Sequence, residues 1–220
     1  MIVRGGWCLA AALVLSGCAD MSNGLADRLA TLGSSPDATN EGIRTLAVLD
    51  GAVRVRGPDG YCIDQGASDA SRGFAIMAGC ALVSDEAVVI PNPDGLIMVQ
   101  FGAEGTASVT GNEDAFAAFL RSESGRGVLS SAGDLAQVPQ VATVTDRAGV
   151  LARFEDTAGP AFEGTSGPQW RGFLDVGSRL TTVSVLSFDR NPLSASAGER
   201  LLVVAMAQLA EVNAQPQPDL

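Results

Sequence analysis

Short apolar runs separated by turn-forming residues fill most of the chain after residue 44. The segment 52–56 alternates apolar and polar side chains, which is typical of a strand that buries one face. Runs rich in Val, Ile, Leu and Phe predict further strands at 61–64, 74–83, 87–90, 96–101, 141–145, 150–155, 170–176 and 180–188. Because short turns separate consecutive runs, the pattern predicts an antiparallel sheet.

Turn sequences predict where the hairpins close. The segments GPDG at 57–60 and NPDG at 92–95 each place Pro, which presets φ, close before Gly, which accepts the left-handed conformation. We therefore expect 52–56 to pair with 61–64 across the first turn, and the runs that flank 92–95 to pair across the second. Later hairpins are expected at 146–149 and at Gly177-Ser178.

One helix is predicted in the middle of the chain. Thr110-Gly-Asn-Glu113 matches a capping box, and Phe116, Phe119 and Leu120 follow on one helical face. A second short helical turn is expected over 127–131.

The last element has the clearest helical pattern. Ser196-Ala-Gly-Glu199 matches a second capping box. Apolar residues then recur at helical spacing, at Leu202, Ala205, Met206, Leu209 and Val212. Leu201, Val203 and Val204 widen this face, so we expect most of the first two turns to be buried.

Together these elements predict one α+β domain at 43–213, with an antiparallel β-sheet packed by a mid-chain helix and a C-terminal helix. Residues 18–42 are expected to form a flexible tether, and 214–220 a disordered tail. The element order is similar to that of the PsbP-like proteins of photosystem II, which also close with a helix laid on a sheet. That resemblance spans about residues 44–213 and implies a fold only.

The N-terminus indicates export. Arg4 precedes a short apolar run at 7–15, which is far below the ~20 residues that span a bilayer. Leu15-Ser16-Gly17-Cys18 follows and resembles the lipobox of bacterial lipoproteins. The resemblance implies a signal peptide at 1–17, cleavage after Gly17, and a diacylglycerol thioether on Cys18.

A lipid on Cys18 would hold the protein on a membrane of the bacterial cell envelope, facing the periplasm. In enterobacterial lipoproteins, Asp directly after the lipidated cysteine favours retention in the inner membrane. Ala19 stands at that position here, which favours the outer membrane. The chain is also similar to small alphaproteobacterial lipoproteins without an assigned activity, which implies no site residues.

The four cysteines fit this interpretation. Cys8 would leave with the signal peptide and Cys18 would carry the lipid, so Cys62 and Cys80 remain. In an oxidising compartment two such residues usually pair, and we expect a structural disulfide. The alternative is a redox pair, although that chemistry favours a Cys-x-x-Cys spacing.

Composition narrows the chemistry further. The chain has no His and no Lys, which excludes Ser-His-Asp and Cys-His catalysis, imidazole metal ligands and lysine Schiff bases. A net charge of −11 argues against a nucleic-acid partner. Carboxylate-based hydrolysis and oxygen-ligand cation sites remain open.

No local constellation stands out as a site. Asp59, Asp64 and Asp69 do not follow an EF-hand pattern, and the acidic pairs 85–86 and 113–114 are explained by turn solvation and helix N-terminal charge. Ser166 lies outside a G-x-S-x-G motif and has no histidine base. We interpret Trp170 as a core residue and its neighbour Arg171 as solvated. We therefore predict no catalytic, cofactor-binding or metal-binding residue.

The leading hypothesis is a non-enzymatic, lipid-anchored envelope protein that binds a protein partner or serves as an accessory of a complex. The alternative is a periplasmic module that binds a small ligand or cation. A third reading, a carboxylate-based hydrolase, requires two acids that face each other across a groove.

Overall fold

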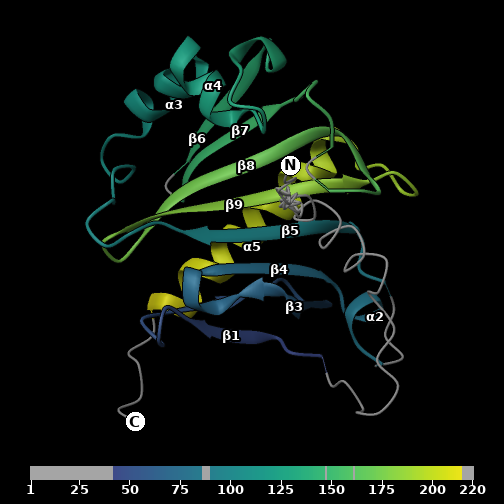
Figure 1. Cartoon of the computed structure of the whole chain (residues 1–220). Helices are drawn as coiled ribbons and strands as arrows, with labels where there is room; N and C mark the ends of the chain where they lie inside the picture. Colours follow the sequence, from purple (N-terminus) through teal and green to yellow (C-terminus); the bar gives the residue numbers. More distant parts are fainter. Residues whose placement is uncertain (1–41, 86–89, 147, 161, 215–220) are drawn as a thin grey trace, which may run out of the picture.

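Seven antiparallel strands form one sheet in the order β3-β4-β5-β9-β8-β7-β6 (Figure 1). The computed structural model describes residues 42–85, 90–146, 148–160 and 162–214. The strands are β3 (Tyr61–Asp69), β4 (Phe74–Gly79), β5 (Gly95–Phe101), β6 (Val141–Asp146), β7 (Gly149–Phe154), β8 (Thr165–Val176) and β9 (Arg179–Phe188). The sheet therefore consists of two meanders, which join where β5 pairs with β9.

Several predictions from the sequence fall outside the described residues. They concern the signal peptide, Cys18 and almost the whole tether at the N-terminus, the tail after residue 214, and most of the strand expected at 87–90. For the described part of the chain the α+β prediction is confirmed, with an antiparallel sheet, mid-chain helices and a long C-terminal helix.

A separate two-stranded hairpin corrects the first predicted pairing. β2 (Val53–Arg56) pairs with β1 (Thr45–Val48) and not with 61–64. The tight turn between them places Leu49 and Asp50 at positive φ, and residues 57–60 carry the chain from this hairpin into the large sheet. The alternating pattern correctly showed that β2 buries Val53 and Val55, but alternation does not say which strand lies alongside.

The apolar run 74–83 is also not one strand. β4 ends at Gly79, and α2 (Cys80–Val83) follows as a single helical turn. Apolar runs of this length do not distinguish a buried strand from a buried helix, which explains the error. A 3-10 turn, η1 (Ala70–Arg72), joins β3 to β4, and Asp69 caps it by accepting the Arg72 N–H.

The predicted disulfide is present. Cys62 on β3 and Cys80 on α2 are bonded across a sequence separation of 18 residues, and both side chains are fully buried. The bond therefore ties the edge strand β3 to the segment that leaves β4.

Helix α5 (Ala195–Ala214) and the β1–β2 hairpin cover one face of the sheet. Leu202 and Met206 are fully buried there, and the indole of Trp170 packs on Gly198, where an added Cβ would lie 2.3 Å from Cε2. The helix begins slightly earlier than predicted, because Ser194 Oγ accepts the Ala197 N–H at 3.2 Å.

The apolar face of α5 is narrower than its composition suggested. Leu201 is buried as expected. Val203 and Val204 are 37% and 47% exposed, because they lie on the side of the helix that turns away from the sheet. The prediction that most of the first two turns are buried was therefore wrong for these two residues.

The opposite face carries a cap over β6, β7 and β8. It consists of α3 (Glu113–Arg121), α4 (Glu123–Leu129) and η2 (Leu135–Gln137). The Phe116 ring packs 5.2 Å from that of Phe173 on β8, and Leu120 is buried. Phe119, expected on the same buried face, is 42% exposed.

The capping box predicted at the start of α3 is not formed. Asn112 is the N-cap and makes no side-chain cap bond, so Thr110 does not cap the helix. Glu113 Oε1 accepts the Gly111 N–H at 2.9 Å, whereas a capping box needs the N–H of the cap residue itself. α4 begins at Glu123, so the predicted turn at 127–131 is the end of a longer helix. Among the described residues, no helix is long and apolar enough to cross a membrane.

Candidate functional site

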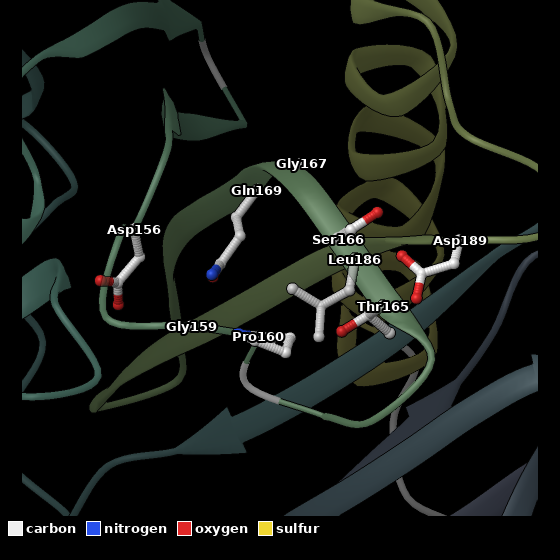
Figure 2. Close-up of a pocket in the computed structure, with 9 residues that line it drawn as sticks. All are labelled: Asp156, Gly159, Pro160, Thr165, Ser166, Gly167, Gln169, Leu186 and Asp189. Atoms are coloured by element: carbon white, nitrogen blue, oxygen red, sulfur yellow. The ribbon is translucent and has the colours of Figure 1, made fainter.

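A pocket of about 350 Å³ opens on the sheet face that carries the α3–α4 cap (Figure 2). Its walls are the loop after β7, the start of β8 and the end of β9. The register of β8 against β9 shifts between Ser166 and Trp170, so a bulge containing Gly167 at φ 72° separates the two parts of β8. This bulge shapes one wall of the pocket.

Gln169 is the most unusual residue of the pocket. It lies just after the bulge and is only 7% exposed. Figure 2 shows its side chain extended into the pocket. Its amide makes no hydrogen bond with any residue of the described chain. The residue is largely buried, but its amide opens on the pocket and is not enclosed, so it is available to a ligand.

Asp156 forms one end of the pocket and is held rigidly. Its Oδ2 accepts the Ser131 N–H at 2.6 Å, and its Oδ1 accepts the Ala158 N–H at 3.0 Å. Burial acts to raise the pKa of this carboxyl, but the backbone N–H donors outweigh burial and lower it. Asp156 is therefore ionised at neutral pH.

Arg171 lies close to Asp156 without lining the pocket. Its guanidinium sits 5.2 Å from the centre of the Phe154 ring, and its Nη1 contacts the Leu129 carbonyl oxygen at 3.5 Å. Burial lowers its pKa, and the charge of Asp156 partly opposes that shift. An arginine stays protonated in such surroundings, so its charge offsets part of the charge of Asp156.

Asp189 supplies a second carboxylate at the other end of the pocket (Figure 2). Its side chain is exposed and makes no ion pair within the described chain. The neighbouring Arg190 is directed elsewhere, because its Nη2 binds Asp94 at 2.7 Å and its guanidinium stacks on Phe188. Between the two acids lie the Ser166 and Thr165 hydroxyls and the apolar side chains of Pro160 and Leu186.

The structure brings together few of the residues that the sequence had singled out. Asp64 accepts the Ala67 N–H at 3.0 Å, and Asp69 caps η1, so both serve turns. Within the described residues no three acidic or cysteine side chains gather in a way that could hold a metal ion. Trp170 is buried under α5, while its neighbour Arg171 lies on the opposite face.

Of these candidates only Ser166 lines the pocket. Sequence reasoning missed Asp156, Gln169 and Asp189. They are separated along the chain, and none of them belongs to a motif. The only local sign was the Gly- and Pro-rich segment between β7 and β8, which is typical of a loop with an irregular backbone.

A second surface lies at the outer end of the same cap. Among the described residues β6 is the terminal strand of the sheet, and there it pairs with β7 alone. Val128 of α4 and Leu135 of η2 are exposed and line a shallow hollow of about 480 Å³. Phe119 of α3 and Val144 of β6 are also exposed. Because α3 packs on β6, we call β6 together with Phe119 and Val144 the β6 edge surface.

The chain matches no protein-family model, no curated protein and no solved structure.

Proposed function

We propose that this chain is a non-enzymatic, lipid-anchored protein of the bacterial cell envelope that binds a protein partner at the β6 edge surface. The lipobox ending at Cys18 supports the anchor. The Cys62–Cys80 disulfide is consistent with an exported protein, because such bonds persist in oxidising compartments.

The open edge of β6 is the observation that carries the binding role. An unpaired strand edge presents a row of backbone N–H and C=O groups. An extended segment of another protein can bind to these groups and add one strand to the sheet. Val141, Thr143, Val144 and Thr145 favour such pairing, since β-branched residues suit a strand. Among the six residues of β6 only the last, Asp146, carries a charge, which would discourage the pairing of another strand.

Side chains on both sheet faces would contact an added strand. Val144 pairs with Leu151 and therefore points to the face that α5 covers. Phe119 lies on the opposite face, on α3, which packs on β6. An added strand would then have an apolar contact on each face of the sheet. Large exposed apolar side chains of this kind are typical of protein interfaces.

The side-chain inventory supports a binding role over catalysis. The chain has no His and no Lys, so the usual general bases and nucleophile activators are lacking. Asp156 and Asp189 do line one pocket, as the hydrolase reading requires. Asp156, however, has a lowered pKa, whereas a general acid needs a raised one.

Site-specific photo-cross-linking in living bacteria tests the partner surface. A photoreactive residue at position 144 is expected to give a discrete cross-linked species. Position 204 on α5 is the matched control, because Val144 and Val204 are 52% and 47% exposed and belong to surfaces of different elements. Identical cross-linking at the two positions, or none at position 144, would contradict the proposed surface.

The anchor is tested separately. Cys18→Ala removes the acyl acceptor, so the variant is expected to leave the processed membrane-bound form and to accumulate as a precursor or in another fraction. Membrane binding with processing like that of the parent would refute the lipobox interpretation.

A further inference from the structure

We propose that the pocket between Asp156 and Asp189 binds a small organic cation through an ammonium or guanidinium group. This site lies at the β8 bulge and does not include the β6 edge surface. The proposal therefore stands or fails independently of the partner surface.

The first observation is an excess of hydrogen-bond acceptors over donors. The pocket offers two carboxylates, which only accept hydrogen bonds, while the Gln169 amide and the Ser166 hydroxyl can each accept or donate. The hydroxyl of Thr165 already donates to the Phe162 carbonyl oxygen at 2.6 Å, so toward the pocket it can only accept. The carboxylates and Thr165 together therefore favour a ligand with several N–H donors, such as an ammonium or guanidinium group.

The second observation is the Gln169 side chain. The residue is only 7% exposed, and its amide has no hydrogen-bond partner among the described residues. The amide atoms are nevertheless not enclosed, since they are absent from the fully buried polar atoms without a partner, so the amide opens on the pocket where a ligand can reach it. Because its side chain extends into the pocket, the ligand is the partner that the geometry allows (Figure 2).

The third observation is charge. Arg171 offsets part of the charge of Asp156, but it is turned toward Phe154 and Leu129 and does not line the pocket. Arg190 is engaged by Asp94, and no cation of the described residues forms an ion pair with Asp189. The net potential in the pocket is therefore negative, and it attracts cations.

Size and lining favour an organic cation over a metal ion. The volume of about 350 Å³ lies at the lower end of the roughly 300–1,000 Å³ typical of small-ligand sites. Pro160 and Leu186 provide an apolar wall for a short methylene chain. A divalent cation would need several oxygen ligands gathered at one point, and the described residues contain no such group.

Isothermal titration of the purified full-length chain tests the proposal. The probes are putrescine, which carries two ammonium groups, and agmatine, which carries one ammonium and one guanidinium. The neutral control is 1,4-butanediol, which has the carbon chain of putrescine without its charge. We expect saturable binding of at least one cation and none of the diol. N-acetyl-arginine amide, as a mimic of a basic side chain, distinguishes a free amine from a protein segment as the natural source.

Variants locate the site. Asp189→Asn and Gln169→Ala are each expected to weaken binding about fivefold, the effect of roughly 1 kcal/mol of lost interaction. Asp59→Asn is the matched control, since Asp59 is an exposed acid in the turn at 57–60, outside the pocket lining. Because Asp189 is exposed, its variant keeps the fold even if Gln169→Ala does not.

Four results would overturn the proposal. They are no saturable heat with either amine at millimolar concentration, equal binding of the diol, an equal effect of Asp59→Asn and Asp189→Asn, and binding of calcium in place of the amines.

Discussion

Removal of the Cys62–Cys80 disulfide tests how the fold depends on an oxidising compartment. The double variant Cys62→Ala/Cys80→Ala opens a loop closed across 18 residues. In the chain-entropy model a loop of this length contributes about 3 kcal/mol to the free energy of unfolding. For a domain of this size that loss lowers Tm by about 6–12 °C. Both cysteines are fully buried, so Ala is chosen because it leaves no unsatisfied hydroxyl.

Urea denaturation followed by circular dichroism measures the effect. The variant should unfold at lower urea than the oxidised parent, with a similar slope. A reductant serves as the internal control, because it should destabilise the parent by a comparable amount and leave the double variant unchanged. An unfolding midpoint of the double variant equal to that of the oxidised parent would show that the bond does not stabilise the fold.

Two further predictions concern packing and pH. Gly198→Ala should destabilise the fold by about 1–3 kcal/mol in thermal unfolding, because its Cβ would lie 2.3 Å from Trp170 Cε2. Gly127→Ala on α4 is the matched control: its nearest contact is an ordinary 3.6 Å, so it should be neutral or stabilising by up to ~1 kcal/mol, and equal losses in the two variants would contradict the packing. Asp175→Asn should cost about 1 kcal/mol at neutral pH, because the carboxylate accepts backbone N–H groups of Ser108, Val109 and Thr110. Burial acts to raise the pKa of Asp175, but these N–H donors lower it overall. The contribution of Asp175 to the free energy of unfolding is therefore fully present above the ordinary Asp pKa, and it is lost as the pH falls through the lowered pKa. The difference between parent and Asp175→Asn should therefore shrink on acidification; a difference that grows in acid would refute this reading.

The parts of the fold that could be predicted from sequence are those with a local cause. The strands β6 to β9 lie close to the predicted segments, because β6 and β7, and likewise β8 and β9, form hairpins with short turns. α5 was visible because its apolar residues recur at helical spacing over many turns.

The errors in the fold have a non-local cause. β2 has a period-two pattern, which reports burial but not its partner, and the turn that joins it to β1 uses Leu49 and Asp50 at positive φ, residues that no turn rule singles out. The predicted width of the buried face of α5 was wrong for a similar reason. Val203 and Val204 are apolar, yet the sheet leaves their side of α5 uncovered.

The candidate pocket was beyond prediction for the same reason. Asp156 and Asp189 are far apart in the sequence, and both line the pocket whose wall is shaped by the register shift in β8 between Ser166 and Trp170. Gln169 looks like any polar residue in the sequence, and only its burial without a partner makes it notable. By contrast, the Cys62–Cys80 pairing followed from counting cysteines, which needs no three-dimensional information.

The proposed location of the protein depends on a lipid at Cys18, and mass spectrometry of the N-terminal peptide from the membrane fraction tests this directly. We predict a mature chain that begins at Cys18 and carries diacylglycerol on its sulfur. A chain that still begins at Met1, or an unmodified Cys18 in the soluble fraction, would contradict it.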